Sequence, residues 1–290
     1  MTERRTWLAL LPAAPLLALL LWWAQHDGGY APRDWLPGGL ALAGLLAVIV
    51  LGLGPVARVP SRPALVAIAA FAAYVAWSFL SITWADDPGR ALQGSERSLV
   101  YLIAFVVATV LPWTARTALW ALGAWVAGIT VLGLVALTDA VTGDPTTSFA
   151  GARFSEPLSY YNADAALWTM AALPAVALAS RRQTPAPARP ALLAATTFLL
   201  GLAFITQSRG WAIGLSLTAL AGLVLLPGRL RFLVALAAAA IALAPFAPTL
   251  LDPYNVTAGL PVEAAPAALS GAMDDAGRAL GLAVLISIGV

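Results

Sequence analysis

Residues 191–226 read ALLAATTFLLGLAFITQSRGWAIGLSLTALAGLVLL, and this stretch decides the fold. Two apolar runs, 191–205 and 212–226, enclose the short polar segment TQSRGW at 206–211. Apolar runs of this length predict helices that cross a lipid bilayer, because a helix satisfies its backbone hydrogen bonds internally. The segment between them predicts a tight hairpin near the bilayer surface. There the guanidinium of Arg209 can offer several donors at once to a phosphate or a carboxylate.

The composition extends this interpretation to the whole chain. Of its 290 residues, 61% are apolar and only 10% are charged, and the mean hydropathy is +0.85. Such values are far from those of a soluble domain. We therefore expect an all-α, polytopic transmembrane helical bundle that forms a single transmembrane domain over residues 1–290. The chain has no cysteine and a single histidine, His26, so we expect no metal site and no cofactor.

Apolar segments predict nine complete spans and a tenth that begins but does not finish. Their expected ranges are 7–24, 38–57, 64–84, 99–113, 117–137, 163–180, 191–205, 210–226, 232–250 and 277–290. The first lacks a small-x-small cleavage site, so we interpret it as a retained anchor rather than a signal peptide. The tenth stops at Val290 without a polar flank, so we expect the chain to be incomplete at its C-terminus.

The distribution of charge between the loops predicts the orientation. With a cytoplasmic N-terminus, ten of the sixteen basic residues fall in short inner loops, where the positive-inside rule applies. These are Arg4, Arg5, Arg58, Arg62, Arg116, Arg181, Arg182, Arg189, Arg229 and Arg231. All acidic residues except Glu3 then fall on the outer side, which agrees with the span count. We therefore expect the N-terminus to lie in the cytoplasm.

Loop length indicates the working face. Three outer loops are large, at about 85–98, 138–162 and 251–276, and large loops on a rigid scaffold commonly carry function. The longest inner loop, 181–190, contains three prolines and is expected to be an extended linker. We therefore expect the active face to point outward.

The hairpin arginine supports two interpretations. Arg209 can be an interfacial side chain that reaches to lipid headgroups, as arginines at span ends commonly do. However, Ser208 and Gly210 are small and leave the guanidinium accessible, and Gly210 can adopt a backbone geometry that exposes the first N–H groups of the next helix. A helix start of this kind attracts anions, which favours an anion site.

The second candidate segment is GARFSEPLSYYNAD at 151–164, which closes the outer loop before the sixth span. Asn162 is expected to cap that helix, with Asp164 in its first turn, and capping alone accounts for both residues. Arg153 has no such structural role. If this loop folds over the hairpin, Arg153 and Arg209 bring two positive charges to one outward pocket, which suits a diphosphate.

Two acidic pairs are further candidates. Asp86 and Asp87 follow the third span, where they can cap a turn, act as acid and base, or hold a divalent ion. Solvated loop acids are more common than catalytic ones, and the same alternatives apply to Asp274-Asp275 beside Arg278. The sequence contains no lysine, so the phosphate-binding Gly-x-x-x-x-Gly-Lys loop of soluble enzymes is missing. The inner arginines are dispersed, which argues against nucleic-acid binding.

Three stretches, in this order, resemble the O-antigen ligase and O-antigen polymerase family of membrane glycosyltransferases. They are LSITWADDP at 80–88, residues 153–166 with their PLSYYNA core, and TQSRGW at 206–211, which looks like the family's Thr-x-Ser-Arg-Gly hairpin. The ordered set, rather than any one motif, carries the resemblance.

This resemblance implies a GT-C-like fold that takes a glycan from an undecaprenyl-diphosphate carrier on the outer face of the bacterial cytoplasmic (inner) membrane. The glycan passes to an acceptor glycan or lipid, or to a growing chain, by inverting transfer without a metal. In this resemblance Arg209 matches the hairpin arginine that holds the diphosphate, and Arg153 matches the arginine of the preceding outer loop. Both are the expected catalytic residues, because fixed guanidinium groups stabilise a leaving diphosphate. The expected substrate-binding residues, from the same stretches, are Ser208, Gly210, Tyr161, Asn162 and Asp86.

One departure from the family concerns a histidine. The ligase branch is associated with a histidine in a large outer loop further along, whereas His26 lies in the first outer loop. Either a C-terminal part after Val290 carries the matching residue, or this chain does not perform that chemistry alone. Because the tenth span is unfinished, we expect the former. Two alternatives stay open. A multispanning exporter of a lipid or polysaccharide would place ionisable residues at mid-membrane, whereas here they lie near span ends. A glycosyltransferase of the cell-shape and division type would carry its large outer loop where this chain has only the hairpin at 206–211.

Overall fold

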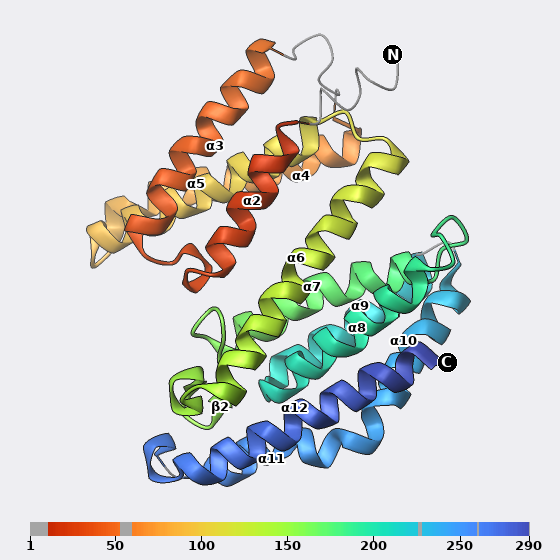
Figure 1. Ribbon diagram of the computed structural model, residues 1–290. Helices are drawn as coiled ribbons and strands as arrows, with labels where there is room; N and C mark the ends of the chain where they lie inside the picture. Colours follow the sequence, from red (N-terminus) through yellow and green to blue (C-terminus); the bar gives the residue numbers. More distant parts are fainter. Residues whose placement is uncertain (1–10, 53–59, 226–227, 260, 290) are drawn as a thin grey trace. The chain divides into compact units, whose positions relative to one another are not determined.

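The computed structural model describes residues 11–52, 60–225, 228–259 and 261–289, and in these ranges the chain is almost entirely α-helical (Figure 1). The expected all-α class is confirmed. The beginning of the expected first span and the inner arginines Arg4, Arg5 and Arg58 lie outside the described residues.

The helices follow one another with short connections. In chain order they are α2 (Ala13–Ala24), α3 (Pro32–Gly52), α4 (Arg62–Ser81), α5 (Pro88–Val110), α6 (Ala115–Thr142), α7 (Tyr161–Ala179), α8 (Ala188–Ile205), α9 (Arg209–Leu225), α10 (Arg229–Leu243), α11 (Ala247–Thr257) and α12 (Pro266–Gly289). Between them lie the 3-10 helices η1 (Asp27–Gly29), η2 (Ile82–Trp84), η3 (Pro145–Ser148), η4 (Ala244–Phe246) and η5 (Val262–Ala264). The α6–α7 connection contains a two-stranded antiparallel sheet formed by β1 (Phe149–Ala150) and β2 (Arg153–Phe154).

Seven of the described helical segments are long and apolar enough to cross a membrane, so the chain is a multi-pass membrane protein. They are Pro32–Gly52, Arg62–Trp84, Pro88–Val110, Ala115–Thr142, Tyr161–Ala179, Ala188–Ile205 and Arg229–Thr257. Helices α2 and α9 are apolar but shorter. The count of ten spans and the GT-C-like arrangement stay predictions.

The expected outer loop 85–98 is largely helical, because α5 begins at Pro88. Asp87 supplies the physical reason: its carboxylate accepts a hydrogen bond from the Arg90 backbone N–H at 3.1 Å, which caps the helix. Pro88 then occupies the first helical position, where its missing N–H has no cost. A span predicted from apolar composition covers only the part of a helix that is buried in lipid. The polar first half of α5 was therefore predicted to be a loop.

The expected loop 251–276 is also mostly helical. Helix α11 continues to Thr257 and α12 begins at Pro266, so the connection between them is residues 258–265. Within α12, Arg278 pairs with Asp274 at 3.0 Å and with Asp275 at 3.8 Å, at i,i+4 and i,i+3 spacing. These ion pairs neutralise charge on the helix surface, so α12 accommodates Asp274 and Asp275 within its length. The third expected loop, 138–162, contains no α-helix from 143 to 160.

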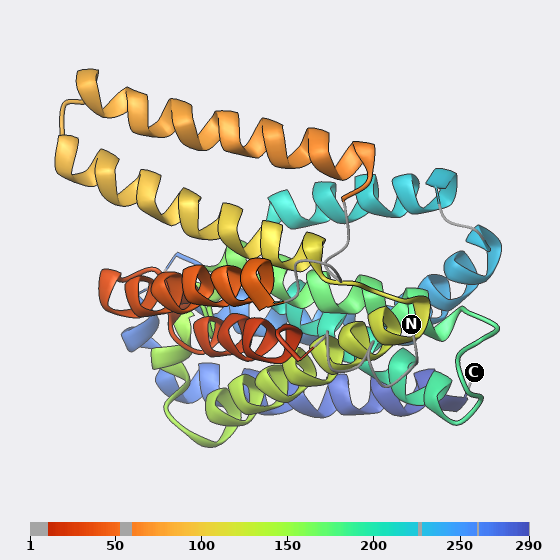
Figure 2. The ribbon, with the colours of Figure 1, turned by 90° about the horizontal axis from the view of Figure 1, so that it is seen from above.

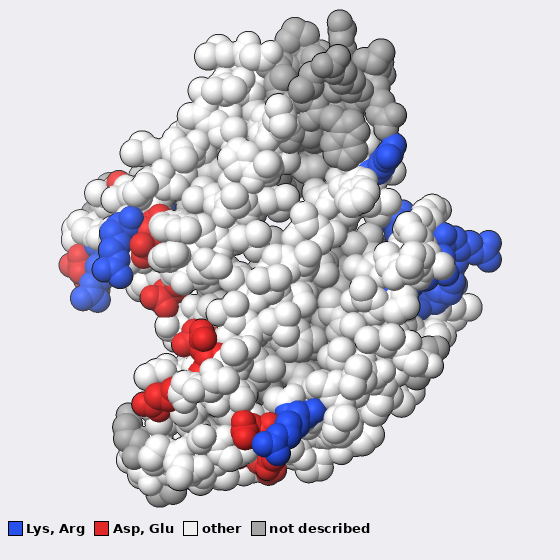
Figure 3. Space-filling model, in the orientation of Figure 1, with Lys and Arg blue, Asp and Glu red and all other residues white. Residues whose placement is uncertain are grey.

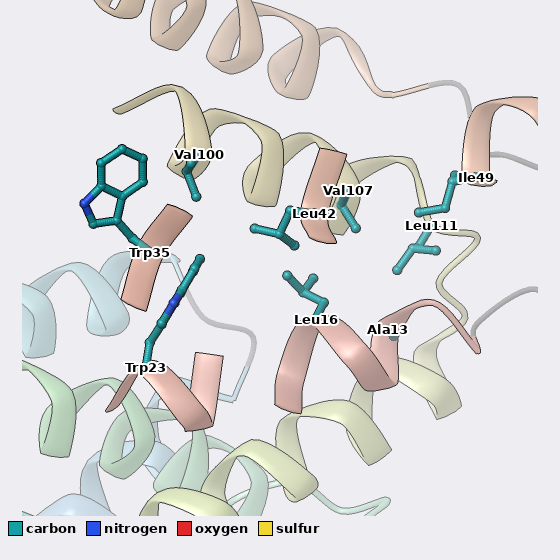
Figure 4. Close-up of a cluster of buried hydrophobic side chains, with 9 residues drawn as sticks. All are labelled: Ala13, Leu16, Trp23, Trp35, Leu42, Ile49, Val100, Val107 and Leu111. Carbon is teal, nitrogen blue, oxygen red and sulfur yellow. The ribbon is translucent and has the colours of Figure 1, made fainter. Parts of the chain in front are cut away.

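Contacts divide the chain into two compact units, residues 1–118 and 119–290. The single transmembrane domain expected for residues 1–290 stays a prediction. In the first unit, α2, α3 and α5 pack around nine buried side chains, shown in Figure 4: Ala13, Leu16, Trp23, Trp35, Leu42, Ile49, Val100, Val107 and Leu111. A Cβ atom at Gly38 would lie 2.5 Å from Cζ2 of Trp23, so the glycine admits the indole against α3. Helix α4 lies alongside α5 and leaves most of its apolar surface exposed, as a lipid-facing helix does (Figure 2).

Helix α8 lies at the centre of the second unit, where it contacts α7, α10, α11 and α12. Small residues allow these close approaches, since a Cβ atom at Gly201 would collide with the Leu280 side chain of α12. Trp168 of α7 and Leu199 of α8 are fully buried. This packing makes α7 and α8 the scaffold from which the connecting segments at both ends of the unit project.

The connection between α7 and α8 is folded, so the prediction of an extended linker is wrong. Thr184 Oγ1 donates a hydrogen bond to the Leu178 carbonyl at 2.6 Å. Arg189 donates from Nε to the Thr184 carbonyl and from Nη2 to the Arg182 carbonyl, each at 3.1 Å. Prolines remove backbone donors, and here side-chain donors replace them.

Candidate functional site

The α6–α7 connection is ordered from its first residues. The carboxylate of Asp144 accepts hydrogen bonds from Thr146 Oγ1 at 2.7 Å and from the Thr146 N–H at 2.9 Å. These hydrogen bonds hold the pKa of Asp144 below its ordinary value of 3.8, and the one from the Thr146 hydroxyl has the larger effect. Its contribution to stability is therefore present above that ordinary value and is lost only as the pH falls through the lowered native pKa.

Arg153 is held by the hairpin of β1 and β2, beside the start of α7. Phe149 lies opposite Phe154, and Ala150 lies opposite Arg153. Phe154 is fully buried, and because successive strand residues point to opposite faces, its burial turns Arg153 outward. The guanidinium carbon of Arg153 lies 4.3 Å from the centre of the Tyr161 ring, in a cation–π contact.

Asn162 does not cap α7, contrary to expectation, because Tyr160 occupies the N-cap position. The Asn162 side chain makes a bridge instead. Its Oδ1 accepts a hydrogen bond from Ser208 Oγ at 2.7 Å, and its Nδ2 donates to Tyr160 Oη at 2.7 Å. Asp164 does lie in the first turn, as expected; it is fully buried, and its Oδ1 accepts a hydrogen bond from the Leu158 N–H at 2.8 Å.

Ser208 builds the hairpin between α8 and α9. Its hydroxyl accepts a hydrogen bond from the Trp211 N–H at 3.1 Å, which is the interaction of an N-cap, while donating to Asn162. The residue in the left-handed backbone region is Gln207, with φ of 51°. Gly210 is the second residue of α9 and is not among the residues with positive φ. Arg209 is exposed at the first position of α9.

These contacts bring six of the seven predicted site residues to one end of the second unit. They are Arg153, Tyr161, Asn162, Ser208, Arg209 and Gly210. The cation–π contact joins the hairpin of β1 and β2 to α7, and the hydrogen bond joins α7 to α9. Asp86 belongs to the first unit, where it is exposed ahead of α5, and its place in the site stays a prediction.

A groove of about 590 Å³ starts at this end and runs between α7 and α9. Its mouth is polar and is lined by Asn162, Ser208 and Gly210. Further along, its walls are mainly apolar and are formed by Ala166, Thr169, Met170, Leu173, Trp211, Gly214, Leu215 and Thr218. The groove therefore has one polar end, formed by residues on either side of Arg209 in the chain and by Asn162, and one apolar length.

Sequence reasoning did not identify Thr169, Trp211 and Gly214 as groove residues. Trp211 Nε1 donates to Thr169 Oγ1 at 2.5 Å, which fixes the indole across the groove wall. A signal was present in α9, because Gly210, Gly214 and Thr218 recur every fourth residue and so share one helix face. Such a face usually packs against another helix. Here it is open, since a Cβ atom at Gly210 or Gly214 would meet nothing within 4 Å.

The arrangement suits a ligand with an anionic head and an apolar tail. Arg209 lies between Ser208 and Gly210, which line the mouth, and its guanidinium offers a planar set of donors. The first N–H groups of α9 have no acceptor within the helix. The positive end of the helix dipole adds to this field. Below the mouth, the apolar walls exclude water from a bound hydrocarbon chain.

The two hydrogen bonds of Ser208 lead to a prediction about stability. Ser208→Ala is expected to destabilise the protein by about 1–2 kcal/mol, because it removes both the cap of α9 and the bond to Asn162. Asn162→Ala keeps the cap but removes the bond to Ser208 and the exposed bond to Tyr160, and it is expected to cost about 1 kcal/mol. Thermal unfolding of both variants in detergent measures the difference. A smaller destabilisation by Ser208→Ala than by Asn162→Ala would contradict the contribution of the cap.

Comparison of the chain with protein-family models, with curated proteins and with solved structures finds no match. The interpretation of the site therefore rests on its geometry and on the motifs at 80–88, 153–166 and 206–211.

Proposed function

We propose that this protein is a membrane glycosyltransferase that transfers or polymerises a glycan from an undecaprenyl-diphosphate carrier, as O-antigen ligases and polymerases do. The single observation that carries the proposal is the 2.7 Å hydrogen bond from Ser208 to Asn162, two residues that are 46 positions apart. It ties the hairpin that bears Arg209 to the helix start against which Arg153 lies. Two arginines on segments that this bond and the Arg153–Tyr161 contact bring to one end of the unit support a diphosphate ligand.

The groove between α7 and α9 supports a donor that is attached to a lipid. A diphosphate at the mouth would meet the Arg209 guanidinium and the start of α9, and the first isoprene units would lie against the apolar wall near Trp211 and Leu215. A sugar nucleotide has no hydrocarbon chain to fill such a wall. The geometry therefore favours a lipid-linked donor over a soluble one.

The proposed reaction exchanges one bond at the sugar for another. An acceptor hydroxyl attacks the sugar C1 from the face opposite the diphosphate, so the configuration inverts. The bond between C1 and the diphosphate oxygen breaks, and the lipid diphosphate leaves with the electron pair. The hydroxyl proton passes to a carboxylate or to water.

The arginines act on the leaving group in this proposal. Negative charge on the diphosphate grows as the bond to C1 breaks, so Arg153 and Arg209 stabilise the transition state more than the bound donor. Two fixed guanidinium groups supply this charge without a metal or a cofactor. Five of the ten inner arginines expected from the sequence belong to the second unit and lie toward its other end, which supports an outward orientation of the groove mouth in the bacterial cytoplasmic membrane.

Reconstitution tests the proposal against the exporter alternative. The purified full chain is placed in proteoliposomes with an oligosaccharide linked to undecaprenyl diphosphate. We expect release of undecaprenyl diphosphate together with a longer or acceptor-linked glycan, both measured by mass spectrometry. Arg153→Ala is expected to lower both products in parallel. Appearance of the intact lipid-linked glycan in the opposite leaflet, with no diphosphate released, would establish an exporter and end the enzymatic proposal.

A further inference from the structure

Four arginines gather at the end of the second unit opposite to Arg209, and we refer to them as the arginine cluster. They are Arg181, Arg182, Arg189 and Arg231, from the end of α7 and the starts of α8 and α10. Because α7 has 19 residues, about 28 Å separates this end from the start of the helix. Figure 3 shows basic side chains grouped over the α7–α8 connection, with no acidic side chain among them on that face.

The arginine cluster surrounds two adjoining cavities. The smaller, of about 260 Å³, is lined by Ser180, Gln183 and three of the cluster arginines. The larger, of about 520 Å³, has all four arginines at one end and continues between α8 and α10 along an apolar wall of Leu193, Leu230, Val234, Ala235 and Ala238. Among the described residues, no acidic side chain lines either cavity.

Local structure holds two of the cluster arginines in place. Arg189 donates to the carbonyls of Thr184 and Arg182, so it fixes the loop and acts as a positioning residue. Arg231 lies over Gly228, whose φ of 85° is in the left-handed region. A Cβ atom at Gly228 would lie 3.2 Å from Arg231 Nη2, so the absent side chain leaves room for the guanidinium.

Arginines at the ends of spans are ordinary in membrane proteins, and topology alone accounts for their presence. Topology does not account for their convergence on a groove. Guanidinium groups that line one cavity repel one another, and an anion between them offsets that repulsion. A free anion would fill only the arginine end, whereas an anionic headgroup with an acyl chain would also cover the wall between α8 and α10.

We propose that the arginine cluster and the groove between α8 and α10 form a binding site for an anionic phospholipid. The phosphate lies between Arg181, Arg182 and Arg231, and the upper part of an acyl chain lies along Val234 and Ala238. The site is at the other end of the unit from Arg209 and does not depend on the proposed glycan transfer.

Lipid retention tests this site. The purified full chain in detergent is titrated with dioleoyl phosphatidylglycerol or dioleoyl phosphatidylcholine, and bound lipid is measured by native mass spectrometry. We expect clear preference for the anionic lipid, and about five-fold weaker affinity for each of Arg181→Gln, Arg182→Gln and Arg231→Gln. Arg278→Gln, an exposed arginine paired with Asp274, is the matched control and is expected to change nothing.

A second variant separates a lipid from a free anion. Ala238→Phe fills the apolar wall and is expected to weaken phosphatidylglycerol binding while all four arginines remain. Far-UV circular dichroism and size-exclusion chromatography check that each variant is folded. Three results would each overturn the proposal: equal retention of the two lipids, unchanged retention in the three arginine variants, or equal protection against thermal unfolding by glycerol 3-phosphate and by phosphatidylglycerol.

Discussion

We expect the Arg209→Ala variant to fold normally but to transfer glycan about 100- to 1,000-fold more slowly than the wild type. The guanidinium is exposed at the first position of α9, where its removal creates no cavity and breaks no packing. Its expected contribution is to the charge that develops on the leaving diphosphate. The rate of the chemical step should therefore fall much more than the affinity for the donor.

The lysine variant and a distant arginine complete this experiment. Arg209→Lys keeps the charge but loses the planar set of donors, so it is expected to recover only part of the transfer rate. Arg278→Ala removes an exposed arginine from α12 and is expected to transfer at the wild-type rate. Measurement is by single-turnover release of undecaprenyl diphosphate. Wild-type transfer by both Arg209 variants would exclude this arginine from catalysis.

Leucine at two glycines is expected to have opposite effects, and this is the second large prediction. Gly214→Leu places a side chain in the open groove between α7 and α9, where a Cβ atom meets nothing within 4 Å. The protein should fold, but the donor lipid should no longer fit, so transfer is expected to be lost. Gly201→Leu places the same side chain against Leu280, where α8 and α12 are in contact, and is expected to destabilise the second unit by about 1–3 kcal/mol or more.

The two leucine variants control for each other because the substitution is identical. Thermal unfolding in detergent reports on folding, and binding of the lipid-linked donor reports on the groove. We expect Gly214→Leu to unfold like the wild type without binding donor, and Gly201→Leu to unfold at lower temperature. Normal donor binding by Gly214→Leu would show that the groove does not receive the lipid.

The hairpin at 206–211 shows how far local sequence patterns reach. A short polar segment between two apolar runs was sufficient to predict that α8 ends and α9 begins there. Local patterns did not identify Gln207 as the left-handed residue of this turn, or the Ser208 cap that lets α9 begin before Gly210. Nor did these patterns predict that α5 begins at Pro88 and α12 at Pro266. Apolar composition reports burial in lipid, whereas a helix start depends on capping hydrogen bonds.

Asn162 shows where local patterns fail. Its position near a helix start predicts capping, yet its side chain bonds to Ser208, on another helix and 46 residues away. The same applies to Gly201 and Gly214, which are alike in sequence context but differ in surroundings. Gly201 packs against the Leu280 side chain of α12, whereas Gly214 lines an open groove.

The sequence by itself determined that this is a multi-pass helical membrane protein with an arginine hairpin near the end of a span, because run length, hydropathy and turn residues act over a few positions. Only the tertiary structure decided that the loop of Arg153 and the hairpin of Arg209 lie at one end of the second unit. Only the tertiary structure decided that an open groove follows from there and that four arginines enclose another groove at the opposite end. Those features depend on which helices pack together, and packing depends on shape complementarity between residues far apart in the chain.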